Sequence, residues 1–152
     1  MNSILSDVAS GAVSLADVVG AQPEVLDQLV DKAMGLAKYG KLDEASKLLS
    51  DLTWFDRRSA MLPLLLGTVR ATAADHEGAV AAYGEALARE EASPSSAAFR
   101  AELWMLRARS ALALQDRATA EQDLRLAAAA GADVSEAAAG LLRAMEGADE
   151  DS

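Results

Sequence analysis

Cysteine is absent from this sequence of 152 residues, and histidine occurs only once, as His76. Without cysteine there is no disulfide, thiol nucleophile or cysteine metal site, and a reducing compartment is compatible. His76 stands next to Glu77 in DHEG, and adjacent helical residues point to different faces, so one site cannot readily use both. Neither a Gly-x-Ser-x-Gly turn nor a glycine-rich loop after a strand occurs. We therefore predict that the protein is not an enzyme and binds no cofactor or metal.

Long apolar runs and a basic N-terminus are also missing. No run approaches the ~20 residues that a membrane span needs, and MNSILSDVASG lacks the basic start of a secretory signal. The net charge of −10 repels nucleic-acid phosphates and anionic membrane surfaces. These absences predict a cytoplasmic protein without nucleic-acid partners or stable membrane insertion. The acidic tail, residues 147–152, is predicted to be disordered.

Alanine and leucine dominate the composition, and this favours an all-α fold. β-Branched residues are sparse, and no alternation with a period of two is sustained. Short connections between the expected helices make neighbours antiparallel, as in helical hairpins. Capping residues and breaks place the helices at about 23–40, 42–52, 59–73 (capped by Ser59), 76–89, 97–114, 117–130 and 135–145.

Small residues recur at the spacing of tetratricopeptide repeats. Ala45 and Ala79, each near the start of a second helix, are 34 residues apart. A third copy follows after 41 residues, and the seven extra residues are assigned to 90-EEASPSS-96. Two helices approach closely only where side chains are small. In each copy a small residue of the first helix faces a small and then a large residue of the second: Ala33, Ala45 and Leu49; Gly67, Ala79 and Tyr83; Ala108, Ala120 and Leu124.

The predicted architecture is three tetratricopeptide hairpins in a right-handed superhelix, between an N-terminal helix and a C-terminal capping helix. Gly40 is expected to allow the tight turn inside the first hairpin. The predicted parts are an N-terminal helical extension at 1–21, a tetratricopeptide domain at 22–146 with repeats at about 26–59, 60–93 and 101–134, and a last helix at 135–145.

The first helix of each hairpin is expected to line a concave wall. Ordinary repeat geometry assigns positions two, five, nine and twelve of these helices to that wall. Flexible methionine side chains suit a groove that grips an extended apolar peptide. Alternatively, some of the methionines pack against the N-terminal segment or a dimer mate. The predicted groove residues are Val30, Met34, Ala37, Met61, Leu64, Thr68, Ala71, Met105, Arg109 and Leu112, with Asp27 and Glu102 at the remaining positions.

Two further side-chain groups, one of which shares Arg109 with the groove, leave alternatives open. Trp54 and Phe55 lie between the first two hairpins, where large residues fill the seam or contact a partner. Arg100, Arg107 and Arg109 form a basic group that either pairs with acids of the chain or orients an acidic partner.

The sequence resembles the class II translocator chaperones of type III secretion, the low-calcium-response protein H family, over about residues 5–145. The resemblance is carried by SGAVSLADVVGAQPEVLDQL from residue 10, by GKLDEA from residue 40, and by LPLLLGTVRATAADHEGAVAAYGEAL at 62–87. It implies a cytoplasmic, non-enzymatic chaperone that keeps hydrophobic secreted translocator proteins soluble before export. The groove would hold an extended translocator segment resembling Pro-x-Leu-x-x-Pro.

The same resemblance implies that the N-terminal helix forms a homodimer, with an interface of Ile4, Leu5, Val8, Leu15 and Val18. Members of the family tend to have aromatic groove residues in the first repeat, where this chain has Val30, Met34 and Ala37, so the accepted peptide motif is expected to differ. The alternative function is that of a tetratricopeptide adaptor that scaffolds another complex, such as one for motility or pilus assembly.

Overall fold

A computed structural model describes residues 23–151, and this part of the chain is helical throughout apart from its connections. The all-α prediction is confirmed, while the predicted extension at 1–21 lies outside the described residues. The helices are α3 (Pro23–Lys38), α4 (Leu42–Phe55), α5 (Met61–Thr72), α6 (His76–Ala92), α7 (Ala97–Ala113), α8 (Arg117–Ala129) and α9 (Ser135–Glu150).

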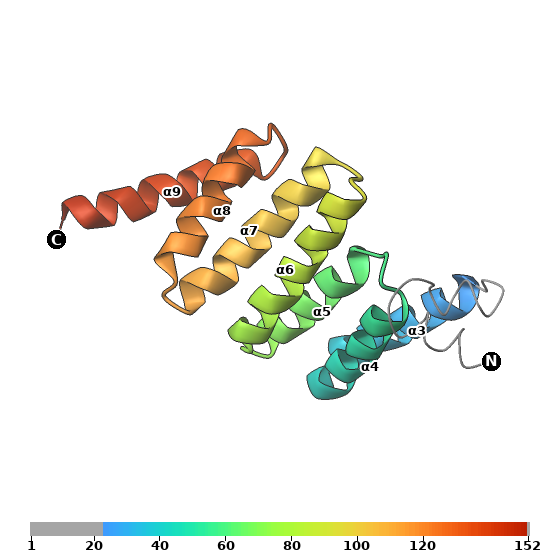
Figure 1. Cartoon of the computed structure of the whole chain (residues 1–152). Coiled ribbons are helices and arrows are strands. Elements are labelled where there is room, and N and C mark those ends of the chain that lie inside the picture. The colour runs from blue at the N-terminus through green and yellow to red at the C-terminus, as the bar shows by residue number, and fades with distance from the viewer. Residues whose placement is uncertain (1–22, 152) are drawn as a thin grey trace.

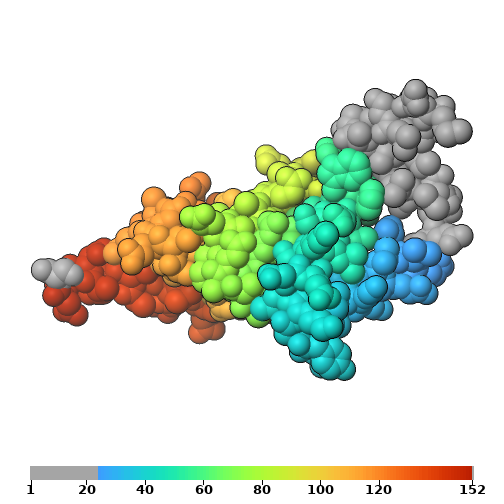
Figure 2. Space-filling view, turned by 90° about the horizontal axis from the view of Figure 1, so that it is seen from below, coloured from blue at the N-terminus to red at the C-terminus, as the bar shows by residue number. Residues whose placement is uncertain are grey.

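The helices form a row in which each packs mainly against the next one along the chain (Figure 1). α3 pairs with α4, α5 with α6, and α7 with α8, while α9 covers α8 at the end of the row. The space-filling view shows the resulting elongated shape, with α3 and α9 at opposite ends (Figure 2). The prediction of three stacked hairpins followed by a capping helix is therefore confirmed.

The predicted small residues lie where the paired helices meet. Gly67 is packed so closely that a Cβ atom there would lie 2.6 Å from Cε1 of Tyr83. The tyrosine ring thus occupies space that glycine leaves free, whereas the first and third hairpins combine alanine with leucine. The remaining members of the three copies are all at most 1% exposed: Ala33, Ala45, Leu49, Ala79, Tyr83, Ala108, Ala120 and Leu124.

The turn inside each hairpin has the same conformation. Gly40, Ala74 and Gln115 occupy equivalent positions and have positive φ angles of 80°, 61° and 61°. The next N–H group donates to a carbonyl oxygen five residues earlier at 2.9 Å in all three turns, for example from Lys41 to Leu36. Such bonds satisfy carbonyl groups at a helix end that would otherwise lack partners. The expected tight turn at Gly40 is therefore present and is repeated at the two other positions.

The seven extra residues of the third copy lengthen two helices. α6 continues three residues further than α4 does, and α7 begins five residues earlier than α5 does, while the connection between α6 and α7 is one residue shorter than that between α4 and α5. Glu90, which is 2% exposed, accepts hydrogen bonds from the N–H groups of Ser95 and Ser96 and from the Ser95 hydroxyl. This buried carboxylate therefore fixes the short connection.

Several helix limits differ from the prediction: α4 and α6 each end three residues later, and the start of α5 and the end of α9 differ as well. α5 begins at Met61 after Ala60, without a side-chain cap, so Ser59 does not cap this helix; its carbonyl oxygen accepts a hydrogen bond from Arg89. Pro63 is thus the third residue of α5, where a missing N–H costs little. α9 continues to Glu150, so the prediction of disorder is wrong for residues 147–150, and Asp149 in this stretch is paired with Arg117.

Arg89 connects the second hairpin to the first. Its guanidinium group donates to the carbonyl oxygens of Thr53, Asp56 and Ser59 at 2.8–2.9 Å, and its Nε donates to Glu85 at 3.0 Å. The side chain is only 9% exposed. One residue of α6 thereby satisfies carbonyl groups at the end of α4 and in the connection that follows it.

Candidate peptide-binding groove

The predicted groove residues lie on one face of α3, α5 and α7, which we call the first-helix wall. On α3, Val30, Met34 and Ala37 are half-buried and pack against the core of the first hairpin. Met61, at the start of α5, is 49% exposed. The wall therefore presents apolar surface along its length, but it divides into separate sections.

The central section of the wall contains a hollow of about 300 Å³ between α5 and α7, which we call the central hollow. It brings together three predicted groove residues, Thr68, Ala71 and Arg109. Five other residues complete the lining: Thr72, His76, Tyr83, Leu106 and Ser110.

The hydrogen bonds at the base of the central hollow have a defined direction. The Thr68 hydroxyl donates to the Leu64 carbonyl oxygen at 3.0 Å, and it lies 3.2 Å from the Tyr83 hydroxyl. Because a hydroxyl group has one proton, Tyr83 must be the donor to Thr68. Burial raises the pKa of Tyr83 above its ordinary value, against the opposite effect of its bond to Thr68, so the phenol stays neutral.

Two predicted groove residues belong to the core instead of the accessible wall. Leu64 is 9% exposed and packs with Ala79 and Tyr83, and Met105 is 3% exposed and packs with Leu124. Position in the repeat places both side chains on the correct helical face, but the neighbouring helices cover them. Changes at these two positions would therefore act first on folding.

Leu112 lies in a second hollow, of about 420 Å³, between the end of α7 and α9. We call it the terminal hollow, and its lining is mainly apolar. It extends the first-helix wall beyond the third hairpin, with α9 in the place of the first helix of a fourth hairpin. Its lining residues are Leu112, Gln115, Arg117, Leu141, Ala144, Met145 and Ala148.

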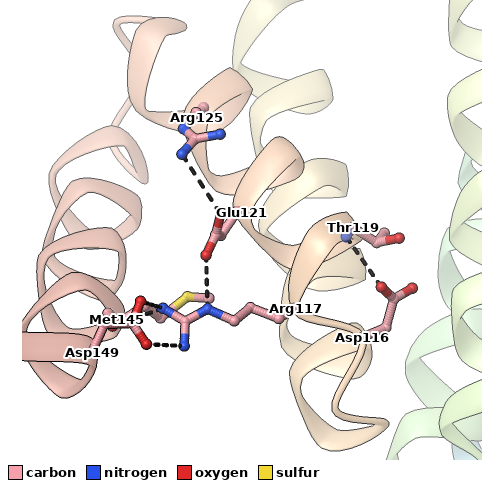
Figure 3. Close-up of polar contacts among 7 residues, drawn as sticks. All are labelled: Asp116, Arg117, Thr119, Glu121, Arg125, Met145 and Asp149. Carbon is pink, nitrogen blue, oxygen red and sulfur yellow. Dashed lines mark hydrogen bonds and ion pairs between the residues drawn. The ribbon is translucent and has the colours of Figure 1, made fainter. Parts of the chain in front are cut away.

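Arg117 holds α9 at the terminal hollow (Figure 3). Its Nε donates to Glu121 at 2.8 Å, Nη1 to Asp149 at 2.8 Å, and Nη2 to the Met145 carbonyl oxygen at 2.9 Å. The hydrogen bond from Arg117 lowers the pKa of Glu121 below its ordinary value. The spacing of Leu141, Met145 and Ala148 on one face of α9 was a sequence signal for this extension of the wall.

The three arginines of the predicted basic group do not act together. Arg107 forms a bidentate pair with Asp123 at 2.7 and 2.8 Å, and this bonding raises the pKa of Arg107. With Arg100 and Trp104, it lines a hollow of about 490 Å³ against α6. The helical spacing places that hollow on the opposite face of α7 from Arg109. Only Arg109 of this group therefore belongs to the first-helix wall.

Other expectations concern residues away from the two hollows. Trp54 is 45% exposed, with its ring edge-to-face against Phe55 and Arg57 above it, so it does not fill the seam, and its contact with a partner stays a prediction. The predicted dimer residues Ile4, Leu5, Val8, Leu15 and Val18 lie outside the described residues. Among residues 23–151, no cluster of potential metal ligands occurs, and no helix is long and apolar enough to cross a membrane.

These helices define a stacked-hairpin protein of the tetratricopeptide type. No protein-family model and no curated protein matches the sequence. The fold is similar to that of SycD, a type III secretion translocator chaperone of Yersinia enterocolitica, with a TM-score of 0.73. Sequence identity is 21%, and the match covers 87% of this chain and 98% of SycD.

Two further solved structures have the same fold. A type III secretion complex from Aeromonas hydrophila matches with a TM-score of 0.80 and 20% identity, over 99% of each chain. PcrH, in complex with the chaperone binding region of PopB, matches with a TM-score of 0.65 and 25% identity. That match covers 83% of this chain and 98% of PcrH. The resemblance to translocator chaperones is confirmed at the level of the fold.

Proposed function

We propose that this protein is a cytoplasmic, non-enzymatic chaperone that binds an extended apolar segment of secreted translocator proteins. The first-helix wall would hold the segment and keep its protein soluble before type III export. The observation that carries the proposal is the likeness of the whole row of helices to PcrH, which was solved with a chaperone binding region. A homodimer formed through residues 1–21 is part of the same proposal.

The two hollows supply the physical basis for binding. An extended chain presents side chains at intervals, and pockets for these side chains give a peptide groove its selectivity. The central hollow contains Ala71 and Leu106, and the terminal hollow contains Leu112 and Leu141. Translocators expose apolar stretches that aggregate unless they are covered, and binding to this wall would cover one of them. The same wall also provides the surface that a general adaptor would need, but the solved likenesses favour the chaperone.

Charge placed inside each hollow tests the proposal. We expect Ala71→Glu and Leu112→Glu each to weaken capture of a co-expressed translocator by at least about tenfold, because the new side chain occupies and charges a surface against which apolar side chains of the segment would pack. The matched control is Ala81→Glu, which introduces the same charge at an exposed position of α6 outside both hollows. The proteins to co-express are membrane-active secreted proteins encoded beside the gene for this chain.

Capture is measured by affinity purification followed by titration of the purified complex. Thermal unfolding of each variant alone identifies losses that are due to misfolding. If both variants bind the translocator as the wild type does, binding uses another surface. If the wild type captures only components that stay in the cytoplasm, the adaptor function replaces the chaperone function.

A further inference from the structure

Arg109 carries a positive charge that the described part of the chain leaves without a partner. Arg70, Arg89, Arg107 and Arg117 all donate hydrogen bonds to acceptors of their own chain. Arg109 makes no hydrogen bond or ion pair with any of residues 23–151, although it is exposed and lines the central hollow. A planar guanidinium in such a position is suited to bind a carboxylate with two parallel hydrogen bonds.

The other polar groups of the central hollow differ in what they can offer a ligand. The protons of Thr68 and Tyr83 are already committed to Leu64 and to Thr68. The Ser110 hydroxyl, on a residue that is 3% exposed, has no partner among the described residues and can donate. His76 Nδ1 is buried and likewise lacks a partner within this part of the chain. The central hollow therefore combines apolar walls with unsatisfied polar atoms, among them the donors of Arg109.

We infer that the central hollow binds an acidic side chain, Asp or Glu, of the extended segment, with its carboxylate held by Arg109 in the hollow that Ser110 also lines. This inference rests on the proposed function and adds a charge requirement to it. The apolar part of the acidic side chain, or of a neighbouring residue, packs against Ala71 and Leu106. The bound segment is then apolar along most of its length and carries one acidic residue at a fixed distance from its apolar anchors.

The overall charge of the protein opposes this preference for an acidic residue, so the two effects can be told apart. A chain with a net charge of −10 repels acidic peptides at long range. A preference for an acidic residue must therefore arise from a local contact that exceeds the general repulsion. A basic residue at the same place would gain from the long-range field and would still be rejected by Arg109.

Selection from a display library of short random peptides tests the inference on the full-length chain. The wild type is expected to select apolar peptides with Asp or Glu at one fixed position relative to the apolar residues. Arg109→Glu is expected to select Lys or Arg at that position. Arg125→Glu is the matched control, since Arg125 is 65% exposed on α8, and its one ion pair with the described residues is a weak one with Glu121 at 3.6 Å. It changes the net charge equally and should select as the wild type does.

A selected peptide and its Asp→Asn or Glu→Gln form are then titrated by fluorescence anisotropy. The amide form should bind the wild type about tenfold more weakly, and the difference should disappear in Arg109→Gln. Equal binding of acid and amide forms overturns the inference and leaves the proposed function intact. If the wild type selects no apolar peptides, or if Ala71→Glu selects the same peptides as the wild type, the proposed function fails and the inference fails with it.

Discussion

The first and second hairpins close in the same way with different residues. Where α3 meets α4, Ala33 faces Leu49, whereas Gly67 faces Tyr83 in the second hairpin. The larger ring is balanced by the loss of a methyl group, and the third hairpin returns to alanine and leucine. The comparison shows that the repeat preserves the combined size of a facing pair, because the spacing between the helices depends on both side chains.

The turns show a second exchange between the same hairpins. The first has glycine at the position of positive φ but Lys41 at the N-cap of α4, where no side chain accepts a hydrogen bond. The second has Ala74 at the positive φ and Asp75 at the N-cap, where its carboxylate accepts from the Gly78 N–H at 2.9 Å. The first hairpin therefore has glycine at the positive φ but no side-chain cap, and the second has a side-chain cap but no glycine at the positive φ.

The largest predicted effect comes from converting the third hairpin toward the second. Arg107 and Asp123 correspond to Leu66 and Ala82, which are both buried in an apolar cluster. Arg107→Leu should lower the free energy of unfolding by about 3 kcal/mol, because Asp123 is 0% exposed and would lose its cation. Chemical denaturation measures the change.

The double variant Arg107→Leu with Asp123→Ala restores the combination of the second hairpin, and it should recover most of the lost stability. A double variant as unstable as Arg107→Leu alone would show that the two hairpins cannot exchange an ion pair for apolar packing.

The second-largest predicted effect tests whether the sizes of the facing residues Gly67 and Tyr83 are matched. Gly67→Ala should lower the free energy of unfolding by about 1–3 kcal/mol, because the added methyl group overlaps the Tyr83 ring. Adding Tyr83→Leu to Gly67→Ala produces the pair of the other hairpins and should remove part of the loss, measured by the same denaturation.

Gly35→Ala is the control, because its added Cβ meets no atom within 4 Å apart from its chain neighbours and the backbone of its own helix. It should be neutral or stabilising by up to about 1 kcal/mol, as expected for glycine replaced inside a helix. Equal losses for Gly35→Ala and Gly67→Ala would mean that the close approach to Tyr83 is not the cause.

The smallest predicted effect on stability comes from placing an N-cap aspartate, such as Asp75 of the second hairpin, at Lys41 of the first. Lys41 has φ and ψ of −84° and 62°, close to the −83° and 74° of Asp75, so an aspartate fits without rearrangement. Lys41→Asp should raise the free energy of unfolding by about 1 kcal/mol. Lys41→Ala removes the same positive charge without adding an acceptor; if it stabilises equally, capping is not responsible.

The repeat spacing was sufficient to predict the hairpins, since small residues 34 apart constrain how helices pair. It also placed Thr68, Ala71 and Arg109 on the first-helix wall, and these three residues meet in the central hollow. Repeat position alone did not distinguish wall from core at Leu64 and Met105, because burial depends on which neighbouring helices cover a side chain.

Features that depend on contacts between distant residues were not predictable from local patterns. The tail appeared disordered because its acidic residues bury nothing by themselves, but Asp149 is paired with Arg117, 32 positions earlier. The contribution of Tyr83 and Ser110 to the central hollow was missed for a similar reason. Repeat geometry assigned the wall to four positions of each first helix, and neither residue occupies one of them.

Arg89 has a consequence for the shape of the whole molecule. In a row of hairpins that touch only their neighbours, the angle at each joint is determined locally and alters the path of everything beyond it. At the joint between the first and second hairpins, one guanidinium group fixes three main-chain oxygens. The curvature offered to a partner is therefore determined partly at a joint, by a side chain that lines neither hollow. Sequence change at such joints can redirect binding while every contact residue stays the same.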